Sequence, residues 1–397
     1  MKEYKYLIIG GGMTADSAVH GIRKLDDSGS IALISEEPDP PYNRPPLSKG
    51  LWKGTSINEI WRGTSSFHVD MFLGRRVTAV DLSLKQAIDS KGDEYHFEKC
   101  LFATGASPNK LPFDNGDIIY LRTLRHYQNL KLLVSKKQRF LVIGAGFIGS
   151  EIAAALALNH RKVTMLFPEE AIGGHVFPPD LSRFINHYYR DKGVDILSRD
   201  YLSWIKKESD HYLIKTENGR QLVVDAIVAG VGVKPNFDLA KDAGLKIGNG
   251  IIVDQQLRTS HPDVYAAGDV ANFYNPSLDK RIRVEHEDNA NHMGEMAGRA
   301  LAGEQVSYTY LPYFYSDLFN LGYEAIGELN SKFETIAHWR EPLHKGAIFY
   351  LDHGKIRGVL LWNLWKKIDV ARGLIGEAYP ISRAKTAGSS IESILKE

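Results

Sequence analysis

Two glycine-rich segments have the composition and spacing of dinucleotide-binding loops. Each follows a short apolar run and precedes a helical pattern: residues 10–15 read Gly-Gly-Gly-Met-Thr-Ala, and residues 144–149 read Gly-Ala-Gly-Phe-Ile-Gly. In such a turn the first glycine makes the tight bend, the second lets backbone amides approach a pyrophosphate, and the third allows close helix packing. The residues expected to line the phosphates are Gly10, Gly12 and Ala15 in the first loop, and Gly144, Gly146 and Gly149 in the second.

Acidic residues farther along indicate which dinucleotide each loop binds. Glu36, after the strand that follows the first helix, is positioned to accept hydrogen bonds from an adenosine ribose. Asp269, after the small-residue turn Ala267-Gly268, suits the ribityl hydroxyls of a flavin. Glu169 or Glu170 follows the corresponding strand of the second copy, where an acid favours the 2′-hydroxyl of NADH over the 2′-phosphate of NADPH. We therefore expect FAD at the first loop and NADH, in preference to NADPH, at the second.

The elements that position these loops form two βαβ units. Strands over 6–9 and 30–34 flank the first helix, and strands over 140–143 and 163–167 flank the second, which is rich in Ala and Leu. The apolar positions of the first helix are Ala15, Ala18, Val19, Ile22 and Leu25. The predicted fold class is α/β, with two Rossmann-like FAD- and NAD-binding domains, the second inserted in the first, and a small α+β C-terminal domain.

Two further strand-to-glycine junctions look like crossings between the domains. Thr104 and Gly105 at the first junction are expected to contact FAD, and Gly232 at the second is expected to contact NAD. Strand-like runs over 323–327, 347–351 and 358–362, with a closing helix from about Ile368, indicate the third domain. The predicted domains are 1–113 with 236–306 for FAD, 114–235 for NAD(H), and 307–397 for the C-terminal, interface-like domain.

Composition narrows the partners. The 397 residues contain 49 Lys and Arg against 48 Asp and Glu, a net charge of +1, so no global field favours nucleic acid or anionic lipid. No apolar run has the length of a membrane span, and the N-terminus does not resemble a secretory signal, so we expect a cytoplasmic protein. Cys100 is the single cysteine, which excludes an internal disulfide, a CxxC redox pair and a cysteine-based zinc site. No metal site is expected.

Segments in all three predicted domains resemble apoptosis-inducing factor and its prokaryotic relatives. The wider group includes the reductases of rubredoxins and of oxygenase-type 2Fe-2S ferredoxins, which share the three-domain plan. The segments that carry the resemblance are residues 33–38, 41–52, 166–169, 264–269, 283–286, 316–318, 322–327, 348–351 and 361–363.

The resemblance implies roles for particular side chains. Lys49 would lie beside the flavin N5 and pair with Glu151, and a cation there stabilises an anionic reduced flavin. Lys49, Glu151 and His286 form the expected catalytic set, with His286 tuning the flavin rather than transferring a proton. The further cofactor contacts that the resemblance implies are Arg44 at the FAD pyrophosphate, Glu285 with His286, Tyr315 where the family commonly has a tryptophan, and Phe147 and Ile148 at the nicotinamide.

These features predict an enzyme, an FAD-dependent NAD(P)H:acceptor oxidoreductase similar to ferredoxin reductases. Hydride would pass from NADH to flavin N5, and electrons would then leave to an external acceptor, a ferredoxin- or rubredoxin-type iron–sulfur carrier or a small molecule. Lys280, Arg281 and Arg283 would form a basic patch that docks an acidic carrier. The alternative is an NADH-responsive binding module with slow turnover and redox-controlled dimerisation or partner recruitment. A homodimer is left open.

Overall fold

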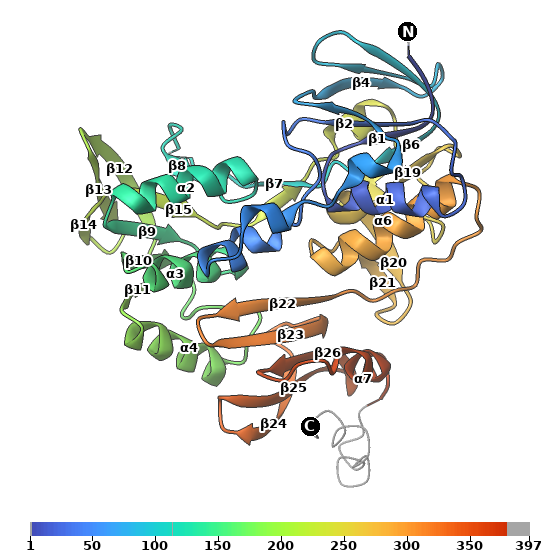
Figure 1. The fold of residues 1–397 in the computed structure, drawn as a ribbon. Coiled ribbons are helices and arrows are strands. Elements are labelled where there is room, and N and C mark those ends of the chain that lie inside the picture. Colours follow the sequence, from blue (N-terminus) through green and yellow to red (C-terminus); the bar gives the residue numbers. More distant parts are fainter. Residues whose placement is uncertain (1, 113, 379–397) are drawn as a thin grey trace. The chain divides into compact units, whose positions relative to one another are not determined.

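The computed structural model describes residues 2–112 and 114–378, which divide into two compact units (Figure 1). The first unit comprises Met1–Arg44, Ser56–Ser107 and Lys234–Pro312, and the second comprises Pro45–Thr55, Pro108–Val233 and Tyr313–Glu397. The short stretch that contains Lys49 therefore folds with the second glycine loop. The division into three domains at residues 113, 235 and 306 stays a prediction.

A seven-stranded sheet forms the core of the first unit. Strand β1 lies between β2 and β6 and pairs in parallel with both, whereas β5 and β4 continue the sheet in antiparallel pairing. Residues Tyr6–Ile9 of β1 are all buried, which explains their unbroken apolar sequence. The strands are β3 (Asp70–Leu73), β2 (Ile31–Ser35), β1 (Lys2–Ile9), β6 (Glu94–Phe102), β5 (Gln86–Asp89) and β4 (Val77–Asp81), with β19 (Val264–Ala266) beside β6.

Helices α1 (Met13–Arg23) and α6 (Glu287–Leu301) of the first unit lie side by side (Figure 1). Glycines permit the close approach. A Cβ at Gly298 would lie 2.0 Å from the carbonyl oxygen of Ala18, a distance at which the atoms overlap. The unit also contains η3 (Ile57–Ile60), η4 (Thr64–Phe67), α5 (Asp238–Asp242), η5 (Gly268–Val270) and a small sheet of β17 (Ile247–Gly248), β18 (Gly250–Ile252), β20 (Ala271–Asn275) and β21 (Lys280–Ile282).

The second unit repeats the parallel arrangement in a five-stranded sheet. Strand β9 leads into the second glycine loop and α3, and β10 then returns parallel to β9, so both predicted βαβ units are confirmed. The sheet order is β11 (Val194–Ser198), β10 (Lys162–Phe167), β9 (Arg139–Ile143), β15 (Ala226–Ala229) and β8 (Ile118–Ile119). The accompanying elements are η1 (Pro45–Leu47), η2 (Gly50–Trp52), α2 (Leu124–Lys136), α3 (Phe147–Leu158), α4 (Pro179–Asp191) and an antiparallel sheet of β12 (Leu202–Glu208), β13 (His211–Thr216) and β14 (Gln221–Val224). The chain crosses between the units in β7 (Ala106–Pro108) and β16 (Val233–Pro235).

A five-stranded antiparallel sheet completes the second unit. The hairpin between β25 and β26 turns at His353 and Gly354, both with positive φ. Helix α7 (Ile368–Leu374) begins at the residue that the sequence indicates, and residues 379–397 of the predicted C-terminal domain lie outside the described residues. The sheet order is β22 (Tyr313–Leu318), β23 (Leu321–Gly327), β26 (Lys355–Trp362), β25 (Lys345–Asp352) and β24 (Glu334–Glu341).

The prediction that Leu25 belongs to the buried face of the first helix is wrong. Helix α1 ends at Arg23, and Leu25 is 52% exposed. The chain turns here because the amides of Leu25 and Asp26 both donate to the carbonyl oxygen of Ile22, and the Asp26 carboxylate then accepts the amide of Gly29 at 2.7 Å. An aspartate that binds backbone amides in this way favours a turn over a further helical residue.

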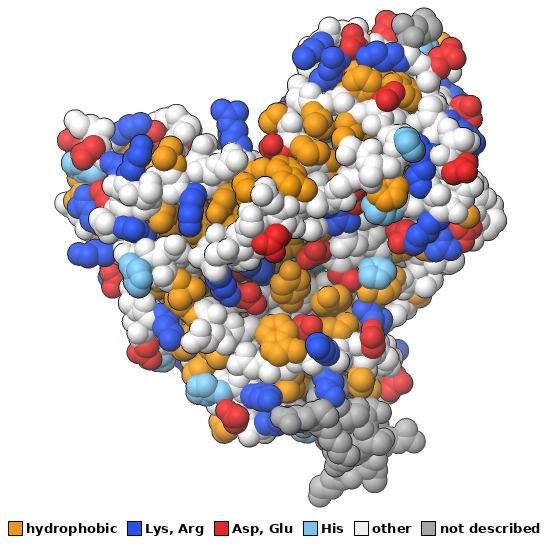
Figure 2. Space-filling model, viewed as in Figure 1, with side chains coloured by type: hydrophobic (Ala, Val, Ile, Leu, Met, Phe, Trp, Pro, Cys, Tyr) orange, Lys and Arg blue, Asp and Glu red, His pale blue; other side chains and the backbone are white. Residues whose placement is uncertain are grey.

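Basic and acidic side chains are interspersed over the face drawn in Figure 2, in keeping with the near-zero net charge. Within residues 2–112 and 114–378, none of the helices combines the length and the hydropathy that crossing a bilayer requires.

The packing of α1 on α6 makes a first prediction. Gly298→Ala should lower the free energy of unfolding by about 1–3 kcal/mol, because the added methyl group overlaps the Ala18 carbonyl. Gly373→Ala in α7 is the matched control: nothing lies within 4 Å of its Cβ position, so alanine should be neutral or slightly stabilising. Urea unfolding measures both variants, and an unchanged midpoint for Gly298→Ala would contradict the close contact.

Candidate functional site

The first glycine loop joins β1 to α1, and its glycines have different surroundings. Gly10 has a φ of +124°, and a Cβ there would lie 2.1 Å from the carbonyl oxygen of Ala103. Gly12 caps α1, and the nearest atom that its Cβ would meet is Nη2 of Arg44, at 3.9 Å. Gly10 is thus needed for backbone packing, whereas Gly12 leaves open space at a helix N-terminus beside a guanidinium. This arrangement fits a pyrophosphate.

Arg44 is held beside the loop by neighbouring polar side chains. Its guanidinium makes an ion pair with Glu37, and the hydroxyl of Tyr42 donates to the same carboxylate at 2.6 Å. Asp269 is buried in η5, which packs on the first turn of α1: a Cβ at Gly268 would lie 2.3 Å from Oγ1 of Thr14. The first unit therefore brings the predicted phosphate contact and the predicted ribityl contact to the same loop.

The remaining predicted FAD contacts of the first unit lie at the ends of its elements. Glu36 is exposed directly after β2, and Ala15 is fully buried in α1. The hydroxyl of Thr104 donates to the carbonyl oxygen of Asn236 at 2.7 Å, and Gly105 follows with a φ of +67°. Glu285 and His286 immediately precede α6, with His286 as its N-cap and half-buried.

The predicted basic patch is wrong for Arg283, whereas Lys280 and Arg281 are exposed. The side chain of Arg283 is only 11% exposed and makes an ion pair with Glu285. Arg281 donates to the carbonyl oxygens of Val253 and Asn272 at 3.0 and 2.8 Å. Both guanidinium groups thus bind parts of the first unit itself, which sequence spacing could not reveal.

The second glycine loop joins β9 to α3. As in the first loop, backbone atoms crowd some of its glycines and leave another one open. A Cβ at Gly144 would lie 2.4 Å from the carbonyl oxygen of Gly230, and one at Gly149 would lie 2.2 Å from that of Gly144. A Cβ at Gly146, the N-cap of α3, would meet nothing within 4 Å. The first and third glycines are required by the backbone, and the middle one faces the space through which a phosphate could approach. Gly232, with a φ of +85°, lies near the Asn109 amide.

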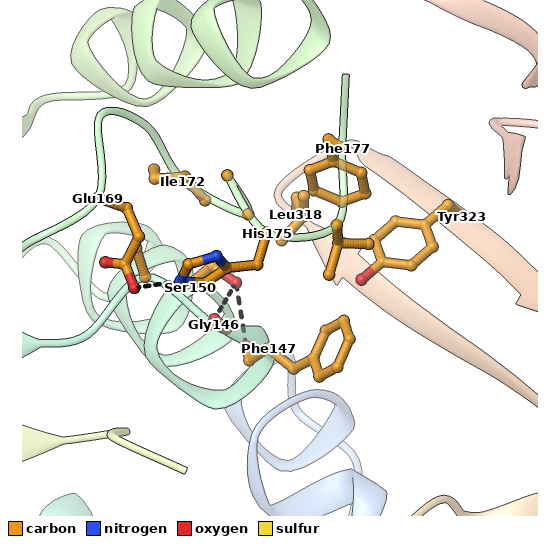
Figure 3. Close-up of a pocket in the computed structure, with 13 residues that line it drawn as sticks. Gly146, Phe147, Ser150, Glu169, Ile172, His175, Phe177, Leu318 and Tyr323 are labelled. Carbon is orange, nitrogen blue, oxygen red and sulfur yellow. Dashed lines mark hydrogen bonds and ion pairs between the residues drawn. The ribbon is translucent and has the colours of Figure 1, made fainter. Parts of the chain in front are cut away.

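A cavity of about 100 Å³ opens beside this loop (Figure 3). One end is polar, with Ser150, Glu169 and His175, and the other is apolar, with Phe177 and Leu318. Nε2 of His175 lies 3.1 Å from Oε1 of Glu169. Oε2 of Glu169 is buried and has no hydrogen-bond partner in the described part of the chain, so it is an acceptor available to a ligand.

The two candidate acids after β10 are now distinguishable. Glu169 lines the cavity, whereas Glu170 is exposed and pairs with Arg199 at 2.9 Å. Phe147 and Ile148 stand at the start of α3 with 36% and 38% exposure, and the Phe147 ring contacts that of Phe314 edge to face at 5.3 Å. Phe147 lines the cavity, and its exposed ring suits the predicted position of a nicotinamide.

Lys49 and Glu151 form a buried ion pair in the second unit. The ammonium lies 2.7 Å from Oε1, with side-chain exposures of 14% for Lys49 and 2% for Glu151. It also lies 5.1 Å from the centre of the Tyr315 ring, within the range of a cation–π contact. The pair lies where segment 45–55, α3 and β22 meet. The predicted pairing is therefore present in the geometry.

Three polar residues that bind Glu151 or Glu169 were not singled out in the sequence. Ser48 and Ser316 both donate to Glu151, and His175 binds Glu169. Ser48 adjoins Lys49 and Ser316 adjoins Tyr315, so proximity in the chain could have indicated the serines. Nothing in the sequence pattern points to His175.

Cys100 does not line the cavity, and it does not contact the Lys49–Glu151 pair. It is fully buried in β6, and burial raises the pKa of its thiol above its usual range, so the thiolate is disfavoured at neutral pH. A buried thiol without a second cysteine behaves as a small apolar side chain.

The chain belongs to the pyridine nucleotide-disulphide oxidoreductase family, whose pattern matches residues 4–294. Residues 338–377 match the C-terminal domain of mitochondrion-associated apoptosis-inducing factor. The resemblance seen in the sequence is thus confirmed. The protein is an NAD(P)H oxidoreductase of the ferredoxin reductase type, in a family that uses FAD and NAD(P)H.

Individual relatives match over nearly the whole chain. Apoptosis-inducing factor 1, mitochondrial, from Dictyostelium discoideum is 32% identical over 94% of this chain and 79% of its own length. Monodehydroascorbate reductase 3 from Arabidopsis thaliana is 32% identical over 99% of this chain and 95% of its own. The solved covalent putidaredoxin reductase–putidaredoxin complex contains a chain that superposes with a TM-score of 0.91 and 26% identity, over 100% of this chain and 99% of that one.

The buried ion pair makes a second prediction. Lys49→Ala should lower the free energy of unfolding by about 3–5 kcal/mol, because it leaves the Glu151 carboxylate buried without its cation. Lys53→Ala is the matched control: its ammonium lies 3.4 Å from Asp317 with 45% exposure, so its removal should cost less than about 1 kcal/mol. Chemical unfolding would compare the variants, and equal losses would contradict the difference in burial.

Proposed function

We propose that the protein oxidises NADH at the second glycine loop and passes electrons, through FAD at the first, to a ferredoxin- or rubredoxin-type iron–sulfur carrier. The observation that carries the proposal is the combination of two glycine loops with the buried Lys49–Glu151 pair. The match to the reductase chain of the putidaredoxin complex supports an iron–sulfur protein as acceptor. Because the chain also matches a monodehydroascorbate reductase, the acceptor survey described below includes a small organic acceptor.

Residues of the first unit would hold the flavin dinucleotide. Gly12 and the N-terminus of α1 would receive the pyrophosphate, with Arg44 supplying positive charge. Asp269 would accept hydrogen bonds from ribityl hydroxyls, and Glu36 from the adenosine ribose. When bound, FAD can accept two electrons as a hydride and release them singly, which is the chemistry needed between NADH and an iron–sulfur carrier.

Residues of the second unit would hold NADH and tune the site. Gly146 would leave room for the pyrophosphate of NADH. Oε2 of Glu169 would accept a hydrogen bond from the 2′-hydroxyl of its adenosine ribose. Phe147 and Ile148 would support the nicotinamide ring. Lys49 would keep a positive charge near the flavin, and Glu151 would limit the cost of burying that charge. The roles of Glu285, His286 and Tyr315 remain as the resemblance implies.

The single buried cysteine supports an acceptor outside the chain. A dithiol relay needs two cysteines, and Cys100 is the only one in the sequence. Electrons would therefore leave to an external carrier rather than to a disulfide of this protein.

The cavity makes a prediction about nucleotide choice. Glu169→Gln should weaken NADH binding by about tenfold, because a charge-assisted hydrogen bond to the 2′-hydroxyl is lost, and should weaken NADPH binding less. Glu170→Gln is the matched control and should leave both affinities unchanged, since that side chain pairs with Arg199 at the surface. Fluorescence titration of the wild type and both variants with NADH and with NADPH measures the dissociation constants. Equal effects of the two variants would refute the assignment of Glu169.

The identity of the acceptor is tested by measuring the turnover of purified holoprotein with several electron acceptors and with NADH as the electron donor. We expect turnover with a 2Fe-2S ferredoxin or a rubredoxin to exceed turnover with oxygen and with the monodehydroascorbate radical by at least about tenfold in kcat/KM, the scale at which one charge-assisted contact discriminates. Faster reduction of the radical would replace the carrier with a small-molecule acceptor.

A second candidate function rests on the match of residues 338–377 to the apoptosis-inducing factor C-terminal domain. In this case NADH would produce a long-lived reduced state that recruits partners or dimerises. Slow turnover with every acceptor, together with an NADH-dependent shift in size-exclusion chromatography, would favour this function over the reductase.

A further inference from the structure

The Glu151 carboxylate accepts hydrogen bonds from two serines in addition to its ion pair. The hydroxyl of Ser48 donates to Oε2 at 2.5 Å, and that of Ser316 donates to Oε1 at 2.6 Å, the oxygen that also binds Lys49. The exposures of Ser48 and Ser316 are 5% and 1%, so neither bond is exchanged for one to bulk water. Both carboxylate oxygens therefore have a neutral donor, and one of them also has the cation.

The donors come from separate parts of the second unit. Ser48 directly precedes Lys49, in a segment whose backbone turns through hydrogen bonds from Ser48 to Pro45 and from Lys49 to Pro46. Ser316 lies in β22, next to Tyr315, whose ring lies under the Lys49 ammonium. Two segments that are far apart in the sequence thus donate to the same carboxylate.

The two serine hydroxyls fix the rotation of the Glu151 carboxylate plane, which the ion pair with Lys49 leaves undetermined. The terminal torsion of a glutamate is broad and roughly two-fold, so a cation alone does not determine how the carboxylate plane is turned. With Ser48 on Oε2 and Ser316 on Oε1, only one orientation satisfies both hydroxyls.

We propose that Ser48 and Ser316 are positioning residues, which hold the Glu151 carboxylate in the orientation that fixes the Lys49 ammonium for its role at the flavin. The inference rests on the proposed function for the consequence in electron transfer, and on the contacts alone for the position of Lys49. Neither serine is assigned contact with a cofactor or a reacting atom.

The test compares Ser48→Ala, Ser316→Ala and the double variant with Ser182→Ala. Ser182 is a matched control because it is 2% exposed, lies in the same unit, and has a hydroxyl with no partner among the described residues. In holoprotein, rapid mixing with saturating NADH should show flavin reduction about tenfold slower in the double variant, the loss expected for misplacing a charged group, while the dissociation constant for NADH changes less than twofold. Ser182→Ala should match the wild type in both quantities.

A second measurement reports the position of Lys49 without electron transfer. Trace labelling with acetic anhydride, read by peptide mass spectrometry, should modify Lys49 at least about threefold faster in the double variant, because a side chain that is no longer held in its buried ion pair is reached more easily by the reagent. Lys53, with 45% exposure, is the internal reference and should not change. Unchanged labelling of Lys49, or reduction at the wild-type rate, would overturn the inference. Absence of flavin reduction by NADH in the wild type would instead refute the proposed function, and the labelling result would still decide the position of Lys49.

Discussion

The second unit is organised around one buried carboxylate. Glu151 is 2% exposed and carries a charge that could not be buried without donors. Lys49, Ser48 and Ser316 supply those donors, and they come from a short segment that folds away from its sequence neighbours and from a strand near the C-terminus. The burial of this carboxylate therefore depends on segment 45–55 and β22 both lying at the start of α3, next to the second glycine loop.

The glycines of both loops have the same two structural roles. In each loop a glycine is required because the backbone passes within about 2 Å of where its Cβ would be, and another leaves open space at a helix N-terminus. The surroundings then differ in charge: Arg44 stands at the first loop, and a cavity with an available Glu169 oxygen opens beside the second. Both loops thus have the form of a dinucleotide-binding turn, with polar side chains beside it.

Features that depend on local spacing could be predicted from the sequence, and features that depend on side-chain orientation could not. The βαβ units follow from apolar runs and glycine spacing, and the Lys49–Glu151 pair follows from a family resemblance. The end of α1 before Leu25 depends on the Asp26 turn, and the low exposure of Arg283 depends on its ion pair with Glu285. That Glu169 lines the cavity and Glu170 does not depends on the direction of each side chain. Each of these outcomes is decided by a contact between residues whose directions are known only in the folded chain.

The most direct test of the account is an anaerobic titration of the purified holoprotein with NADH, followed by the visible absorbance of the flavin. The account predicts that about one equivalent of NADH bleaches the oxidised flavin band. It also predicts that NADPH does so only at higher concentration, because the Glu169 carboxylate can accept a hydrogen bond from a 2′-hydroxyl but repels a 2′-phosphate. An unchanged flavin spectrum with both nucleotides would contradict it.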